Sequence, residues 1–297
     1  MSYAAKVKEE IYLSRPSKDR NYRAFCYGLL LLGKRFDENH IYIATEHITV
    51  SKLYGYAVKD SIGKKAYFCE HQTPRGSSLY TVELSDRDEI KKLMKFFDHY
   101  DSINYDLVDE DNFQSFLRGA FMACGTVSEP NKSYHLEMTV PEGEIADLLF
   151  ERLSEMGYPP KSMQRRGQTV LYYKESEQIE DFLTMIGATH CSLQLMETKI
   201  YKDIRNRANR AANCDAANAD KMLKAAERQL ADINLLREED GFEELSPSAQ
   251  AIAILRENNP DASLSELANL SGLTRSGVNH RMEQIKQAAE KVRIKRV

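Results

Sequence analysis

The chain has 297 residues, with 41 lysines and arginines against 45 aspartates and glutamates, and therefore a formal net charge of -4. Its 42% hydrophobic and 29% charged residues are typical of a globular protein, and its length suffices for about two domains. These values exclude a disordered or fibrous chain and a protein that is basic throughout.

The N-terminal segment, residues 1–22, mixes basic and acidic residues, which the apolar core of a signal peptide does not tolerate. The longest apolar run, Tyr27 to Gly33, is far shorter than the roughly 18 residues that a membrane helix needs. The five cysteines are scattered and include no CxxC pair, so we expect reduced thiols and no metal site. These features predict a cytoplasmic protein without a membrane segment or cofactor.

Residues 23–190 contain an internal duplication. Two apolar helices, Phe25–Gly33 and Phe116–Gly125, each have one glycine near the start and another near the end. Strand patterns follow each helix, and an acidic-capped amphipathic helix closes each half, at Ser85–Met94 and at Glu175–Thr184. The expected strands are Ile41–Thr45, Lys65–Cys69, Leu79–Glu83, Tyr134–Val140 and Thr169–Tyr173.

The two repeats, at about 23–100 and 112–188, predict an α+β domain of duplicated αββαββ units related by a pseudo-twofold axis. Gly28 and Gly119 would let the two apolar helices approach closely, because glycine has no side chain to separate the backbones. The alternative interpretation is a pair of unrelated buried helices in a larger fold.

The second apolar helix, Gly119–Gly125, resembles the core helix of LAGLIDADG homing endonucleases, and Gly28–Lys34 is a weaker version of it. In active nucleases of this kind, an acidic residue near the end of each helix holds the divalent metal that activates water. Cys124 and Gly33 occupy those places here, and neither is a hard oxygen ligand. The resemblance therefore implies a nuclease scaffold without nuclease chemistry.

Two acidic residues, Asp37 and Glu129, follow the helices by a few positions and would have to move to replace the missing ligands. In the resembling nucleases, polar and basic strand residues meet DNA. This likeness gives possible secondary DNA contacts at Lys161, Arg165 and Arg166, with Gln164 and Lys174 nearby. The alternative for this segment is an ordinary charged hairpin.

The segment 191–244 is expected to be a helical linker that is basic in its first half and ends in the acidic joint Arg237–Glu244. An all-α domain, residues 245–297, follows. Ser246 and Pro247 begin its first helix, which ends at Asn259-Pro260.

A second, short helix is predicted from Ser263, which forms a capping box with Glu266. Gly272 provides the left-handed turn after this helix, and Thr274 caps a third helix that runs to Lys286. A short helix, a glycine turn and a longer helix form the helix-turn-helix arrangement, whose second member lies in the major groove of DNA.

In the third helix, Val278, Met282 and Ile285 form the buried stripe, and polar and basic residues remain for the groove. Arginine can pair with guanine, asparagine with adenine, and the free amides of the first turn can meet a phosphate. The predicted DNA-binding residues are Ser263, Thr274, Arg275, Ser276, Asn279, His280, Arg281 and Lys286. The basic excess from Arg275 onward favours DNA over the alternative of a protein-docking helical domain. His280 is equally interpreted as a solvated polar residue.

The whole chain resembles the WhiA family, on the runs Phe116–Ser128, Lys132–Glu137, Asn213–Asn218, Ser263–Leu267 and Ser276–Arg281. The resemblance implies a degenerate homing-endonuclease domain, a linker, and a helix-turn-helix domain similar to the promoter-recognising region of sigma factors. It also implies a nucleoid-associated transcription regulator of cell division and chromosome segregation, and of sporulation in spore formers. The greatest departure from the family lies at Gly33-Lys34.

Double-stranded promoter DNA is the partner that this resemblance implies, together with RNA polymerase or another transcription regulator. Two other hypotheses remain open from the sequence. One is a metal-dependent LAGLIDADG-type endonuclease whose ligands have moved, and the other is an adaptor that binds a transcription or division protein through its first domain.

Overall fold

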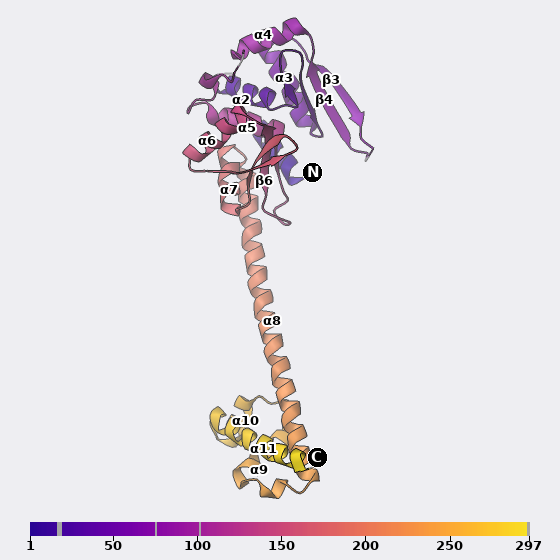
Figure 1. Ribbon diagram of the computed structural model, residues 1–297, viewed down its shortest axis with the longest axis vertical. Helices are drawn as coiled ribbons and strands as arrows, with labels where there is room; N and C mark the ends of the chain where they lie inside the picture. The colour runs from indigo at the N-terminus through magenta and orange to yellow at the C-terminus, as the bar shows by residue number, and fades with distance from the viewer. Residues whose placement is uncertain (17–19, 75, 101, 296–297) are drawn as a thin grey trace. The chain divides into compact units, whose positions relative to one another are not determined.

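The computed structural model describes residues 1–16, 20–74, 76–100 and 102–295. The chain divides into two compact units, Met1–Lys202 and Asp203–Val297, called unit 1 and unit 2 below (Figure 1). Unit 1 contains two mixed helix and strand repeats, and unit 2 is helical.

The two repeats of unit 1 have the same order of elements. The first comprises α2 (Arg20–Leu31), β1 (Arg35–Phe36), β2 (Ile41–Thr45), α3 (Ile48–Ile62), β3 (Tyr67–Gln72), β4 (Ser78–Leu84) and α4 (Arg87–Phe97). The second comprises α5 (Phe113–Cys124), β5 (Gly125–Val127), β6 (Leu136–Pro141), α6 (Glu144–Glu155), β7 (Lys161–Arg165), β8 (Gln168–Tyr173) and α7 (Ser176–Met185). A short 3-10 turn, η1 (Tyr105–Leu107), lies between them.

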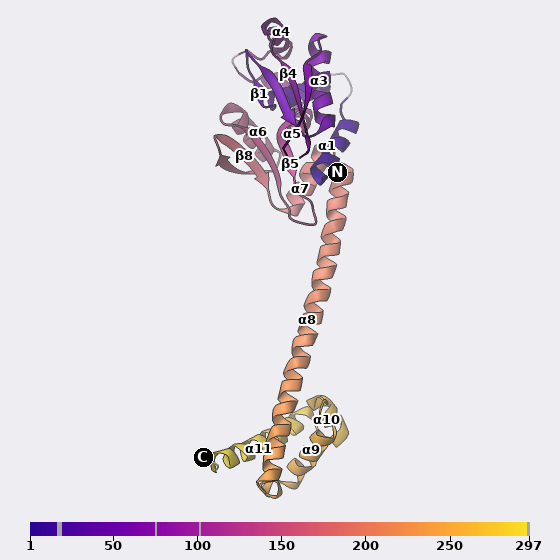
Figure 2. The ribbon, with the colours of Figure 1, turned by 90° about the vertical axis from the view of Figure 1, so that its right-hand side faces the viewer.

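Each repeat contributes one antiparallel four-stranded sheet, in the orders β1-β2-β4-β3 and β5-β6-β8-β7 (Figure 2). The matching strand orders confirm the predicted duplication and the α+β class. The expected strands agree with β2, β4, β6 and β8, and Lys65–Cys69 is displaced toward β3. The sequence did not indicate β1, β5 or β7, because β1 has two residues, β5 three, and all five residues of β7 are exposed.

Helices α2 and α5 pack against each other at the centre of unit 1, and two glycines set their separation. A Cβ atom added at Gly28 would lie 2.1 Å from the Phe116 carbonyl oxygen, and one at Gly119 would lie 1.9 Å from that of Phe25. Both values are below any real Cβ contact, so only glycine fits either position. The predicted close approach of the two helices is thereby confirmed.

The N-terminal helix α1 (Tyr3–Leu13) belongs to the same core, with Tyr3, Val7 and Ile11 buried against it. From the same helix, the Glu10 carboxylate accepts hydrogen bonds of 2.6 Å and 2.9 Å from the backbone amides of His190 and Cys191. These amides open α8 (Thr189–Glu238), and a carboxylate is stabilising at the positive end of a helix.

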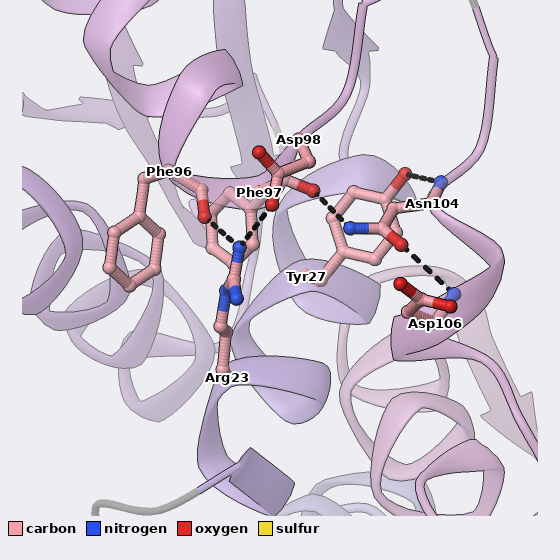
Figure 3. A network of polar contacts seen from close by, with 7 residues as sticks. All are labelled: Arg23, Tyr27, Phe96, Phe97, Asp98, Asn104 and Asp106. Atoms are coloured by element: carbon pink, nitrogen blue, oxygen red, sulfur yellow. Dashed lines mark hydrogen bonds and ion pairs between the residues drawn. The ribbon is translucent and has the colours of Figure 1, made fainter.

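A polar network ties α2 to the connection between the repeats (Figure 3). The Tyr27 hydroxyl accepts a hydrogen bond of 3.0 Å from the Asn104 backbone amide, and its ring stacks on Phe97. The Asn104 side chain donates 2.8 Å to the Phe97 carbonyl oxygen, and Arg23 forms a 3.0 Å ion pair with Asp98. The connection is therefore held against the central helix rather than left as a loose loop.

Unit 2 is built from the end of α8 and from η2 (Phe242–Glu244), α9 (Pro247–Asn258), α10 (Leu264–Ser271) and α11 (Arg275–Lys295). Its core includes Ile233 and Leu236 of α8, which are buried with side chains of α9, α10 and α11. The all-α class of the second domain is confirmed. Among the described residues, none of the helices is both long and apolar enough to cross a membrane.

Candidate nucleic-acid interface

Local capping signals fix the ends of α9, α10 and α11. The Ser246 hydroxyl accepts from the Ala249 amide, and Ser263 and Glu266 form the predicted reciprocal capping box. Gly272 adopts the left-handed conformation with φ of 70° after α10, and the Thr274 hydroxyl accepts 3.1 Å from the Gly277 amide. The predicted helix-turn-helix arrangement is thus present in α10 and α11.

One face of α11 is buried and fixes the orientation of the other. Val278, Met282 and Ile285 lie in the unit 2 core, as the helical spacing predicts, and Ala289 continues the same stripe. Their burial against α9 and α10 turns the polar residues of the first two turns outward, because positions three and four apart share a face.

Four of the predicted contact residues are exposed on the first two turns of α11: Arg275, Ser276, Asn279 and His280. Lys286, two turns further on, is also exposed and lies 3.5 Å from the Glu283 carboxylate. An exposed pair of this kind contributes little stability, so the lysine is available to a phosphate. These side chains offer donors and acceptors suited to base edges and phosphates.

The other three predicted residues also have roles within the domain. The hydroxyls of Ser263 and Thr274 hold the first turns of α10 and α11. Arg281 is half-buried and donates 2.8 Å from Nη1 to the Gly277 carbonyl oxygen of its own helix. Its Nε atom is buried without a partner among the described residues, so the guanidinium is only partly satisfied in the free protein.

Sequence reasoning missed the part that α8 plays beside α11. A cavity of about 430 Å³ lies between these helices, and Asn279 and Lys286 line it together with Arg228 and Gln229 of α8. The Arg228 side chain is exposed next to the predicted contact residues. Residues 191–244 were interpreted as a linker, and alternating charges along a helix gave no signal for this placement.

A buried arginine that sequence reasoning also missed shapes the turn before α10. Arg256 is only 2% exposed, and its Nη1 atom donates to the carbonyl oxygens of Asn259, Pro260 and Ala262. Burial lowers the pKa of its guanidinium. The bonds hold the connection between α9 and α10, which positions the short helix of the motif.

The possible secondary contacts lie in unit 1, on the edge strand β7 and its turn. Lys161, Arg165 and Arg166 are all exposed. Arg165 donates 2.9 Å to the Glu137 carboxylate on β6, and Glu137 also contacts His135 at 3.1 Å. Burial raises the pKa of Glu137, but the hydrogen bonds from Arg165 and His135 outweigh it and hold the pKa below its usual value.

The places of the nuclease metal ligands lie at the ends of the central helices. Gly33 and Cys124 line one cavity there, and the Cys124 thiol donates 3.2 Å to the Ala120 carbonyl oxygen. Burial raises the pKa of this thiol to about 12. Among the described residues, no group of three or more histidines, cysteines, aspartates or glutamates could hold a metal ion.

The two acidic residues that follow these helices are engaged elsewhere. Glu129 accepts 2.7 Å from the Tyr3 amide at the start of α1. Asp37 accepts 2.9 Å from the amides of Asn39 and His40 in a tight turn and pairs with Arg35. Neither acid lines the cavity that contains Gly33 and Cys124.

Two family models match the chain. The model described as the WhiA C-terminal HTH domain matches residues 208–289, and the one described as the WhiA LAGLIDADG-like domain matches residues 113–205. The first of these matches begins within α8, in agreement with the contribution of that helix to the unit 2 core.

Full-length relatives are similar to the chain. A protein of Clostridium tetani named probable cell division protein WhiA is 32% identical over 314 residues, which cover 98% of each chain. A protein of Carboxydothermus hydrogenoformans with the same name is 32% identical over 312 residues, covering 99% of this chain and 98% of the other. The crystal structure of full-length DUF199/WhiA from Thermotoga maritima shares the fold, with a TM-score of 0.58, 22% identity, and coverage of 98% and 99%.

Proposed function

The chain belongs to the WhiA family, and on this premise we propose that it is a DNA-binding transcription regulator that acts in cell division. In this proposal α11 enters the major groove of promoter DNA. The protein also influences chromosome segregation and, in spore formers, sporulation. It works in the cytoplasm at the nucleoid, with RNA polymerase or another transcription regulator as its protein partner.

The exposed face of α11 is the observation that carries the proposal. Arg275, Ser276 and Asn279 project from the first two turns of a helix whose opposite face is buried in the core of unit 2. A helix presented in this way fits the major groove, and arginine and asparagine can each form two hydrogen bonds with one base. The secondary contacts Lys161, Arg165 and Arg166 are proposed for a second, weaker duplex contact by unit 1.

We further infer that the protein has no nuclease activity. The support comes from the residues at the ends of α2 and α5, which are a glycine and a partly buried cysteine where a hard cation needs carboxylate oxygens. The nearby acids Asp37 and Glu129 already accept backbone hydrogen bonds at other sites.

We propose four segments for the chain, with boundaries at 1–22, 23–190, 191–244 and 245–297.

Fluorescence anisotropy with a duplex selected for binding tests the DNA proposal. Arg275→Ala should weaken binding by about 1–3 kcal/mol, or roughly 5- to 150-fold, and relax the preference for one base. Lys92→Ala, which removes one exposed charge from α4 of unit 1, is the matched control and should leave affinity unchanged. Equal affinities of the Arg275 variant and the control would contradict the role given to α11.

The two other hypotheses are tested with the full chain. Plasmid cleavage in Mg²⁺ or Mn²⁺ that a chelator abolishes would contradict the inference that nuclease activity is lost. An adaptor would keep its cellular regulatory effect in the Arg275→Ala variant, whereas a regulator that reads DNA would lose it.

The affinity of the protein for the duplex should also fall steeply as the salt concentration rises, because phosphate contacts release counterions.

A further inference from the structure

The cavity at the ends of the central helices of unit 1 has the dimensions of a small-molecule site. It has a volume of about 570 Å³ and lies where α2 and α5 end, lined on one side by Gly33 and Cys124. Residues of the second sheet, including Thr139 and Gln168, complete its wall. Sites for small ligands usually span about 300–1,000 Å³ and combine apolar walls with a few polar groups.

All charged side chains that line this cavity are basic. They are Lys34, which follows α2, and Arg165 and Arg166 at the end of β7. Among the described residues, no aspartate or glutamate lines it. The C-terminal ends of α2 and α5 each carry about half a negative charge. The three positive charges of the lining side chains outweigh this total. The position that accommodates a metal cation in the nucleases is therefore electropositive in this chain.

A further basic residue of unit 1, Lys8, is buried and acts on the Cys124 thiol. The Lys8 side chain of α1 is 6% exposed, and its charge and that of Lys34 both act on the Cys124 thiol. Burial is the larger effect on that thiol and raises its pKa, while the two ammonium groups oppose the rise. Both lysines are therefore close to the end of α5.

Two of the three lining cations are available to a ligand. Arg165 is held by the Glu137 carboxylate at 2.9 Å and by the Thr139 hydroxyl at 3.3 Å. Lys34 and Arg166 are exposed, and neither has an ion-pair partner within residues 1–16, 20–74, 76–100 and 102–295. Unpaired cations in a cavity favour an anion with several oxygen atoms.

The backbone at Arg166 places its side chain at the cavity despite a local cost. Arg166 and Gly167 form the two-residue turn between β7 and β8, with φ values of 55° and 72°. Asparagine or glycine usually occupies the first of these left-handed positions, and another residue costs on the order of 1 kcal/mol there. Arg166 thus occupies a position where local conformation alone would favour asparagine or glycine.

We propose that this cavity binds a small phosphorylated anion of the nucleoside di- or triphosphate class. The Lys34 ammonium and the Arg166 guanidinium bind the phosphate oxygens, and Gln168 supplies a further donor. The apolar wall at Ala44, Ala123 and Pro141 contacts the rest of the ligand. Binding needs no divalent cation, because the lining side chains include no carboxylate to share one. The site is separate from the helix-turn-helix of unit 2 and does not depend on its DNA binding.

The test uses full-length protein, fluorescent N-methylanthraniloyl ATP and GTP as probes, tripolyphosphate as competitor, and EDTA throughout. We expect saturable binding that tripolyphosphate displaces. The double variant Lys34→Glu/Arg166→Glu should bind the probes at least tenfold more weakly. The matched control is Lys92→Glu/Lys95→Glu, which makes the same charge change on the exposed face of α4 and should bind as the parent does.

A parallel titration with a selected DNA duplex identifies the source of the phosphate. Loss of probe binding by the Lys34/Arg166 variant, with binding retained by the α4 control, supports the proposal. The DNA affinity of the variant does not decide it, because Arg166 is also proposed as a secondary contact to DNA. No probe binding by the parent protein at millimolar concentration overturns it, as does equal binding by the variant and the α4 control. If the parent protein binds no probe and the variant binds DNA more weakly than the α4 control, the proposal is also overturned, and the cavity residues contact the DNA backbone instead.

Discussion

Gly119 offers the sharpest test of the central helix contact. Alanine normally stabilises a helix interior relative to glycine by about 1 kcal/mol. A Cβ atom at this position, however, would lie 1.9 Å from the Phe25 carbonyl oxygen and 2.9 Å from the Leu29 amide nitrogen. The two contact atoms belong to the backbone of α2, so a rotamer change cannot relieve them. Gly119→Ala must therefore push α2 and α5 apart.

The expected loss follows from the size of that displacement. An ordinary Cβ contact begins near 3.4 Å, so the helices must move apart by more than 1 Å. A gap of this size forfeits between a quarter and a half of the dispersion energy across the contact. Phe25, Leu29 and Phe116 are fully buried there, and each gains about 1.5–3 kcal/mol from burial. Loss of a third of this total is about 1.5–3 kcal/mol, and the helix gain of about 1 kcal/mol reduces it to a net destabilisation of about 0.5–2 kcal/mol before any strain.

Gly55 of α3 provides the matched control, because its added Cβ would meet only Val82 Cγ1 at an ordinary 3.8 Å. Gly55→Ala should stabilise unit 1 by about 0.5–1 kcal/mol. All 16 tyrosines precede Asp203 and the chain has no tryptophan, so tyrosine fluorescence during urea unfolding reports on unit 1 alone. If Gly119→Ala were as favourable as Gly55→Ala, the close contact of α2 and α5 would be refuted.

Two further predictions concern a buried charge and a helix cap. Burial lowers the pKa of Lys8 from 10.5 to about 8, which corresponds to about 3 kcal/mol. The unfolded chain keeps this proton up to about pH 10.5, so the penalty is complete below pH 8 and fades as the pH rises. Lys8→Met should therefore stabilise unit 1 at pH 7 more than at pH 10.5 in urea unfolding, and a pH-independent effect would contradict the buried charge. Ser263→Ala removes the cap of α10 and should cost about 1 kcal/mol, seen as faster hydrogen exchange in α10. Ser263→Thr should restore protection, and unchanged exchange in the alanine variant would show that the cap contributes nothing.

Features determined by neighbouring residues could be predicted from the sequence. The capping box at Ser263 and Glu266, the turn at Gly272 and the cap at Thr274 each depend on a few consecutive residues. The buried stripe of α11 follows from helical spacing alone. The glycines at 28 and 119 were informative because their repeat pattern showed that two distant helices share one environment.

Features determined by distant contacts could not be predicted. Strand β7 is exposed along its whole length and four of its five residues are polar, and it is a strand because its backbone pairs with β8. Lys8 lies in a sequence of mixed charges typical of a surface helix, yet α1 packs into the core and buries it. The same limit applies to Arg228, whose place beside α11 depends on how the end of α8 packs in unit 2.

The central helices separate two requirements that are joined in an active nuclease. Gly28 and Gly119 are needed for the helix contact, because any side chain there would collide with the opposing backbone. Gly33 and Cys124, at the helix ends, line a cavity, and a Cβ atom added at Gly33 would meet Tyr42 of β2 at 2.9 Å rather than the opposing helix. Metal ligands can therefore be lost at the ends without loss of the fold. In our proposal, Lys34 and Arg166 make the same cavity an anion site, and the left-handed backbone at Arg166 costs on the order of 1 kcal/mol.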